Sequence, residues 1–174
     1  MGNNVLSAGY SKQKVTPDYS APLSGYGNIM GRMSEGVLDD LYVTCVTITS
    51  GEDTIFIYCL DILGIDDEML VRFRTAVTEA TGVAGEKIFC AATHTHNAPS
   101  FADHPEAKMY KNEFLAACAK AAQQALADRA PATVMAGKKK LPGMNYVRHV
   151  VLEDGTTLYT DAFTDSVLGA LQRY

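Results

Sequence analysis

Residues 54–92 carry the strongest constraint on the fold, because they read as a strand, a helix and a second strand in succession. The runs 54–60 and 87–92 are short and apolar, as buried strands are. Residues 66–82 open with three acidic side chains, repeat apolar side chains at helical spacing and end at a glycine. A strand–helix–strand unit places its two strands in parallel in one sheet, with a right-handed crossover. The sequence therefore predicts an α/β protein.

The rest of the chain adds elements to this unit. Residues 105–128 show the apolar stripe of a long helix, which Pro105 opens and Pro131 ends. Glycine and proline crowd residues 10–40, which are expected to form a long irregular segment. Further elements are expected at 41–49 (strand), 132–138 (strand), 145–160 (hairpin) and 165–174 (start of a short helix). We expect a mixed sheet with a βαβ unit and helices packed on it, with residues 1–174 forming a single, incomplete portion of a larger domain.

Composition and charge exclude several classes of protein. The chain has 15 Lys and Arg against 20 Asp and Glu, so it lacks the basic surface of a nucleic-acid-binding protein. No stretch approaches the roughly 20 apolar residues of a transmembrane helix. The N-terminus lacks the pattern of a signal peptide, and we therefore expect a cytoplasmic protein. The cysteines lack CxxC spacing and are expected to be small buried thiols: Cys45, Cys59, Cys90 and Cys118.

Two histidines stand where the second strand of the βαβ unit ends. The segment 93–99, directly after that strand, reads Thr-His-Thr-His-Asn-Ala-Pro. Residues i and i+2 of an extended segment point to the same side, so His94 and His96 are expected to face one pocket. Asp61 follows the strand 54–60, and the carboxyl ends of parallel strands meet at the sheet edge where α/β proteins bind ligands. Two imidazoles near a carboxylate favour metal-assisted chemistry.

The other polar candidates have more than one interpretation. Asp61 can cap the turn that follows its strand, accept a hydrogen bond from a histidine behind a metal, or bind a metal itself. Arg148 can be an exposed charge on a strand or can bind an anionic or carbonyl group through its forked guanidinium. His104 and His149 are expected to be ordinary polar side chains near the surface of the core.

The chain resembles a known family. Taken together and in order, five segments are similar to the N-terminal part of the neutral (non-lysosomal) ceramidase family. Each segment alone carries little information, but their spacing also fits, and the resemblance covers residues 9 to about 100. The segments are Gly9–Pro17, Pro22–Gly27, Gly36–Tyr42, Leu60–Ile65 and Ala92–Pro99.

The resemblance implies a zinc-dependent amidase that splits the N-acyl bond of ceramide, with a role in sphingolipid metabolism. In that family the first histidine of the motif is a zinc ligand, which corresponds to His94. The second lies beside the metal and handles the substrate, which corresponds to His96. An arginine further along the chain contributes to the site, and Arg148 is the matching candidate here. The substrate is expected to be a lipid amide or another small-molecule amide.

The family takes its other zinc ligands, a second histidine, a glutamate and a tyrosine, from regions downstream of the motif, and no residue of this chain matches them. The sequence is therefore expected to be the front portion of such a domain, inactive alone and weak in binding Zn²⁺. An incomplete sheet leaves edges that favour association into a homo-oligomer. The alternative is a catalytically silent domain that binds a small molecule or a partner chain in the same cleft at the strand ends.

Overall fold

The computed structural model describes residues 6–26, 32–102, 104–144, 149–152 and 154–159. It contains two compact units, Met1–Val134 and Met135–Tyr174. That both belong to a single domain portion, as expected from the sequence, stays a prediction.

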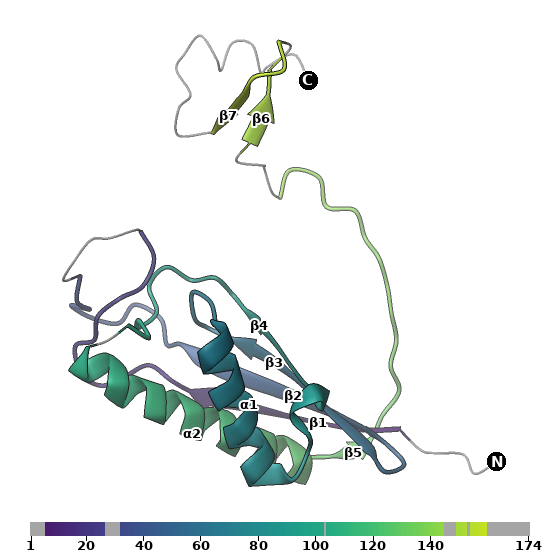
Figure 1. Ribbon diagram of the computed structural model, residues 1–174. Helices are drawn as coiled ribbons and strands as arrows, with labels where there is room; N and C mark the ends of the chain where they lie inside the picture. Colours follow the sequence, from purple (N-terminus) through teal and green to yellow (C-terminus); the bar gives the residue numbers. More distant parts are fainter. Residues whose placement is uncertain (1–5, 27–31, 103, 145–148, 153, 160–174) are drawn as a thin grey trace. The chain divides into compact units, whose positions relative to one another are not determined.

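The first unit is a five-stranded mixed sheet with two helices packed on it (Figure 1). Strand order is β4-β3-β2-β1-β5, and only β3 and β4 run parallel. This confirms the predicted βαβ unit and the mixed sheet. The elements are β1 (Leu6–Lys14), β2 (Tyr42–Ser50), β3 (Asp53–Leu60), α1 (Asp67–Thr81), the 3₁₀ turn η1 (Gly85–Lys87), β4 (Ile88–Ala92), α2 (Pro105–Ala127) and β5 (Ala130–Pro131).

Helix α1 begins and ends at the residues that the sequence indicates. The Asp66 carboxylate accepts a hydrogen bond from the Met69 amide at 2.8 Å, which satisfies one of the free N–H groups of the first turn. Gly82 ends the helix in the left-handed conformation, with φ of 75°, and its amide donates to the Thr78 carbonyl. The crossover between the two parallel strands is therefore fixed at both ends, which sets where β4 and the following histidines lie.

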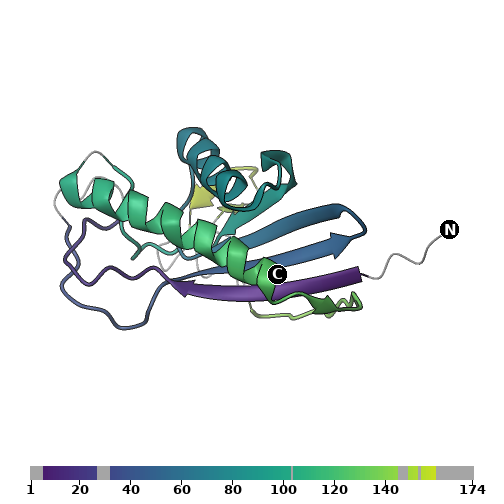
Figure 2. The same cartoon turned by 90° about the horizontal axis from the view of Figure 1, so that it is seen from below.

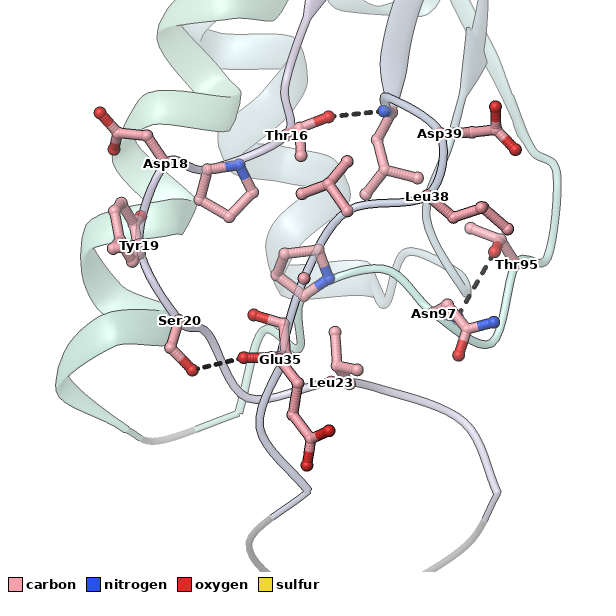
Figure 3. Close-up of a pocket in the computed structure, with 16 residues that line it drawn as sticks. Thr16, Asp18, Tyr19, Ser20, Leu23, Glu35, Leu38, Asp39, Thr95 and Asn97 are labelled. Carbon is pink, nitrogen blue, oxygen red and sulfur yellow. Dashed lines mark hydrogen bonds between the residues drawn. The ribbon is translucent and has the colours of Figure 1, made fainter.

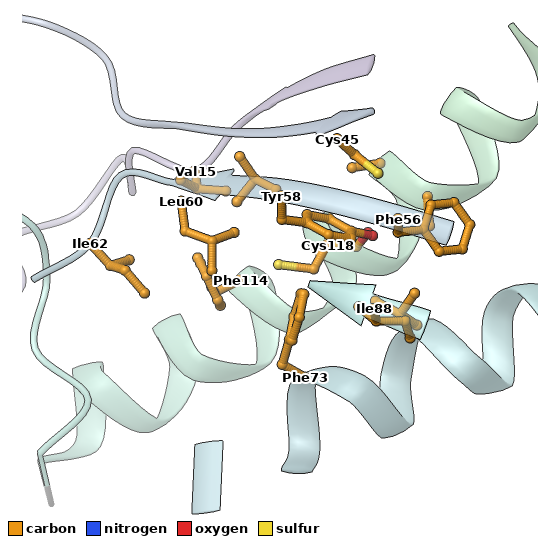
Figure 4. Close-up of a cluster of buried hydrophobic side chains, with 14 of the residues drawn as sticks. Val15, Cys45, Phe56, Tyr58, Leu60, Ile62, Phe73, Ile88, Phe114 and Cys118 are labelled. Carbon is orange, nitrogen blue, oxygen red and sulfur yellow. The ribbon is translucent and has the colours of Figure 1, made fainter. Parts of the chain in front are cut away.

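Both helices cover the same face of the sheet (Figure 2), and the core lies between the helices and the sheet. Aromatic side chains dominate it: the rings of Tyr58 and Phe73 meet edge to face, with centroids 5.0 Å apart. The Tyr58 hydroxyl donates to the Cys118 carbonyl at 2.8 Å, so β3 is tied to α2 through the core. Figure 4 shows this cluster, whose labelled members are Val15, Cys45, Phe56, Tyr58, Leu60, Ile62, Phe73, Ile88, Phe114 and Cys118.

No described helix of the first unit covers the opposite face of its sheet. The strand registers align Tyr10, Val46, Ile57 and Phe89 in one row across four strands, and Tyr10 and Phe89 are each 51% exposed. Cys59 also lies on this face and is exposed, so the prediction that every cysteine is buried is wrong for Cys59. All four cysteines are free thiols. Homo-oligomerisation stays a prediction.

Cys59 is expected to be the thiol that reacts fastest with Ellman's reagent in the native protein. Burial raises the pKa of the Cys45 thiol to about 12 and that of the Cys118 thiol well above its ordinary value, and both are inaccessible. A fast phase should therefore disappear in Cys59→Ser and persist in Cys118→Ser, while guanidinium exposes all four thiols of the wild type. A fast phase that survives Cys59→Ser would contradict the exposed position of this side chain.

Two expectations for the first unit and its end are wrong. Residues 10–40 were expected to be irregular throughout, but strand β1 (Leu6–Lys14) includes the first five of them. The serine, lysine and glutamine side chains of this strand gave no strand signal. Residues 132–138 form no strand; β5 ends at Pro131, and the residues after it are mostly exposed, without a face to bury.

The second unit contains an antiparallel hairpin, β6 (His149–Val151) and β7 (Thr157–Tyr159), which confirms the predicted hairpin in its described part. The Asp154 carboxylate accepts from the Thr156 amide at 2.8 Å within the turn. The helix expected at 165–174 lies outside the described residues. Among the helices that the structure describes, none is both long enough and apolar enough to span a bilayer.

Candidate functional site

The histidine segment leaves the sheet at the end of β4. The Thr93 amide donates to the Leu60 carbonyl at 2.9 Å, which extends the parallel pairing of β3 and β4 by one step. His94 then adopts φ of 62°, a left-handed conformation that non-glycine residues rarely take. The segment is therefore not extended, and alternation along a strand does not explain how its side chains lie. The two imidazoles nevertheless meet: their centroids are 4.9 Å apart and their planes cross at 76°.

A hydrogen bond to a backbone carbonyl orients the imidazole of His94. Its Nδ1 lies 2.7 Å from the carbonyl oxygen of Leu63, in the loop after β3. A carbonyl oxygen only accepts hydrogen bonds, so Nδ1 must carry the hydrogen and the lone pair of the neutral ring stands on Nε2. Among the described residues Nε2 has no hydrogen-bond partner. This is the arrangement in which an imidazole binds a metal, with the other ring nitrogen donating to a fixed acceptor.

His96 has the opposite arrangement. Its Nδ1 accepts a hydrogen bond from the backbone amide of Tyr26 at 3.4 Å, so the hydrogen of the neutral ring stands on Nε2. The ring of Tyr26 also meets the imidazole edge to face, with centroids 5.0 Å apart. The two histidines therefore offer different groups: a bare nitrogen at His94 and an N–H donor at His96.

The loop that approaches His96 fits closely around it. Gly25 has φ of 86°, and a Cβ on this residue would lie 2.5 Å from Cγ of His96. The loop returns through a short antiparallel contact, in which the Leu23 amide donates to the Arg32 carbonyl at 2.8 Å. The Arg32 guanidinium donates to the carbonyl oxygens of Ser24 and His96. Glycine is required here because any larger residue would displace the imidazole.

A cavity of about 560 Å³ opens beside His94. Its walls are mostly apolar and come from the loops after β3 and after the histidine segment. His94 is the histidine that lines it. The apolar lining residues include Ile62, Leu63, Ile65, Pro99 and Phe101.

A second cavity, of about 610 Å³, is bordered by Thr95 and Asn97 of the histidine segment (Figure 3). Thr95 and Asn97 line it, whereas His94 and His96 do not. Its walls combine apolar side chains such as Leu23 and Leu38 with the exposed carboxylates of the N-terminal loops. His94 thus borders the first cavity, Thr95 and Asn97 border the second, and His96 lines neither of the two.

Asp61 contacts the backbone of the neighbouring strand. Its carboxylate accepts from the Tyr42 amide at 2.9 Å, and its own amide donates to the Tyr42 carbonyl at 3.0 Å. These bonds join the end of β3 to the start of β2, and the acceptor of the hydrogen bond from His94 is the Leu63 carbonyl. A role for Asp61 in orienting a histidine stays a prediction. Arg148 lies outside the described residues.

The described residues fit one ligand of a zinc ion and do not supply a full set. His94 has the free nitrogen and the fixed acceptor that a ligand needs. No group of three or more His, Cys, Asp or Glu side chains that could hold a metal occurs in the part of the chain that the structure describes. A catalytic zinc normally has three protein ligands.

Four residues of this region escaped the sequence analysis as individual contributors. Leu63 acts through its backbone carbonyl, which no side-chain pattern reveals. The Arg32 guanidinium contacts residues far along the chain. Gly25 and Tyr26 lie in a segment that resembles the ceramidase family. Gly25 was the one sequence feature there that could have indicated a close approach of the backbone to another residue.

Comparison of the sequence with protein-family models and with curated proteins gives no match. Comparison of the structure does: neutral ceramidase from Pseudomonas aeruginosa superposes with a TM-score of 0.64 at 17% identity, over 75% of this chain and 23% of that chain. The chain has a neutral ceramidase-like fold. A structure described as ceramidase complexed with C2 gives a TM-score of 0.63 at 17% identity, over 74% and 22% of the two chains. At the level of the fold, this likeness confirms the resemblance to neutral ceramidases that the sequence segments indicated. This chain spans under a quarter of the length of the ceramidases that it matches.

Proposed function

We propose that this chain carries part of the active site of a zinc-dependent hydrolase of N-acyl amide bonds, those of ceramide or of another amide. The observation that carries the proposal is the unlike arrangement of the two adjacent imidazoles, with a free nitrogen on His94 and an N–H on His96. The neutral ceramidase-like fold supports it.

In this proposal His94 holds the zinc ion through Nε2, and the other ligands come from residues beyond those described. A bound zinc ion supplies Lewis-acid activation of a water molecule and of the scissile carbonyl. The Leu63 carbonyl keeps the hydrogen on Nδ1 and so keeps Nε2 available. Since this acceptor is a backbone atom, substitution of the leucine side chain leaves it in place.

His96 acts on the substrate. Its Nε2–H can donate a hydrogen bond to the carbonyl oxygen as negative charge develops there. The Tyr26 amide holds the hydrogen on Nε2 by occupying Nδ1. Arg148 is proposed as a further contact to the carbonyl or to a product carboxylate, for which a guanidinium is suited.

The cavity beside His94 favours an amide with an apolar part. Its volume of about 560 Å³ is in the range of small-molecule sites. Ile62, Ile65 and Phe101 give its walls an apolar character that suits an acyl chain. The substrate proposed is therefore a lipid amide or a comparably apolar N-acyl amide.

His94→Ala is expected to weaken zinc binding at least about 100-fold, since loss of a ligand costs more than the 10–100-fold of a lost supporting contact. His104→Ala is the matched control, because it also removes an imidazole but from the start of α2. Zinc titration by calorimetry and hydrolysis of a fluorogenic N-acyl amide are measured on the same preparations of a longer protein that carries the remaining zinc ligands. Equal zinc affinity in both variants would sink the proposal.

The second candidate is a catalytically silent domain that binds a small molecule in the same cavity. It is favoured by the lack, among the described residues, of a three-ligand metal group. Zinc-independent binding of an N-acyl amide by the wild type and by His94→Ala, without turnover, would select this candidate.

A further inference from the structure

We propose that Arg32 is the positioning residue that sets the place of His96. This role rests on the proposed function for its catalytic meaning, but its structural content does not require zinc or substrate. No sequence pattern pointed to Arg32, which lies in the N-terminal loop region, 64 residues before His96.

The guanidinium of Arg32 bridges the N-terminal loop and the histidine segment through three hydrogen bonds. Its NH2 donates to the carbonyl of His96 and, at 2.6 Å, to the carbonyl of Ser24. Its NH1 donates to Oδ1 of Asn97 at 3.1 Å. One planar group therefore fixes the turn that carries His96 against the loop that carries Tyr26.

The same group also holds Tyr26 in place. The guanidinium carbon lies 4.9 Å from the centroid of the Tyr26 ring, within range of a cation–π contact. Tyr26 in turn meets His96 twice, through its amide at Nδ1 and through its ring. Arg32 thus acts on the imidazole from two sides, by binding the His96 carbonyl and by holding the residue that occupies Nδ1.

An arginine suits this position better than a lysine. The three acceptors and the aromatic ring require donors in a fixed plane, which a guanidinium provides and an ammonium does not. Ser24 is tied separately to the segment, because its hydroxyl donates to the Ala98 carbonyl at 3.0 Å. That bond preserves the packing of the two segments when Arg32 is changed, and leaves the placement of His96 as the property that depends on Arg32.

The buried core does not include Arg32 or its partners, so loss of the guanidinium is expected to leave the fold intact. What should change is the contact between the two imidazoles, whose centroids are 4.9 Å apart. Ring protons at that separation give a nuclear Overhauser cross-peak in the metal-free protein. This signal reports His96 directly and is independent of zinc and of turnover.

The test compares Arg32→Met and Arg32→Lys with Arg72→Met, a control that removes an exposed arginine from α1. We expect loss of the His94–His96 cross-peak in Arg32→Met, a weakened one in Arg32→Lys and an unchanged one in Arg72→Met, at similar thermal midpoints. A wild-type cross-peak in folded Arg32→Met overturns the proposal. Should Arg32→Met fail to fold, a wild-type cross-peak in Arg32→Lys overturns it instead, because the planar fork is then not needed.

The outcomes separate this role from the proposed function. A wild-type protein with the cross-peak intact but without zinc binding or hydrolysis speaks against the amide hydrolase and leaves the role of Arg32 standing. Where hydrolysis is measurable, Arg32→Met is expected to lower kcat with little change in KM, since His96 acts as charge develops in the reaction. A rise in KM alone counts against a positioning role.

Discussion

Gly9→Ala is expected to lower the free energy of unfolding by about 3 kcal/mol, at the upper end of the usual cost of overpacking. Gly9 lies within β1, where the strand packs against the end of α2. A Cβ on this residue would lie 2.0 Å from the Ala125 carbonyl oxygen and 2.9 Å from the Arg129 amide nitrogen. Both are backbone atoms, so neither can rotate away, and the helix end must move off the sheet.

Gly36→Ala is the matched control. A Cβ there meets no atom within 4 Å and the backbone is not left-handed, so the free energy of unfolding should change by less than about 1 kcal/mol. Urea denaturation followed by circular dichroism gives both values. Equal midpoints for the two variants would mean that β1 and α2 are not in the close contact described.

The parts of the fold that the sequence predicted are those in which apolar periodicity and caps agree. The βαβ unit is such a case, since Asp66 and Gly82 mark the helix ends. Strand β1 was missed because it presents polar residues to the core: Ser11 is buried and its hydroxyl donates to the Ala121 carbonyl at 2.7 Å. A side chain of that kind gives no hydrophobic signal, and its partner lies 110 residues away.

Cys59 shows the converse error. Its apolar neighbours in the sequence predicted burial, but burial of both faces of a strand needs a layer on each side of the sheet. The described helices of the first unit lie on one face only, so every second residue of β3 is open. Periodicity thus located the strand correctly and could not tell how many of its faces are covered.

The sequence predicted that His94 and His96 lie together, but not the backbone geometry that brings them together. His94 and His96 do lie together, but a left-handed residue and a turn bring this about in place of an extended strand. The groups that make the two rings unequal are the Leu63 carbonyl and the Tyr26 amide. Every residue has a backbone carbonyl and every residue except proline has a backbone amide hydrogen, so their use at a site depends on the fold and leaves no mark in the sequence.

Gly25→Ala is expected to lower amide hydrolysis by about 100-fold, the size of effect that a displacement of about 1 Å can have on a reacting group. The added methyl group would stand 2.5–2.7 Å from three ring and Cβ atoms of His96, so the imidazole must move. The His94–His96 cross-peak should weaken in parallel, which tests the displacement even in the absence of measurable turnover.

Alanine at Gly25 also strains the backbone, whose φ is 86°, and this cost must be separated from the loss of space. Gly82 provides the comparison: its φ of 75° imposes a similar strain, but a Cβ there meets no atom within 4 Å. Both variants should therefore lose about 1 kcal/mol of stability. Only Gly25→Ala should lose hydrolysis and the cross-peak. Equal loss of activity in both variants would show that general destabilisation, rather than the position of His96, controls the reaction.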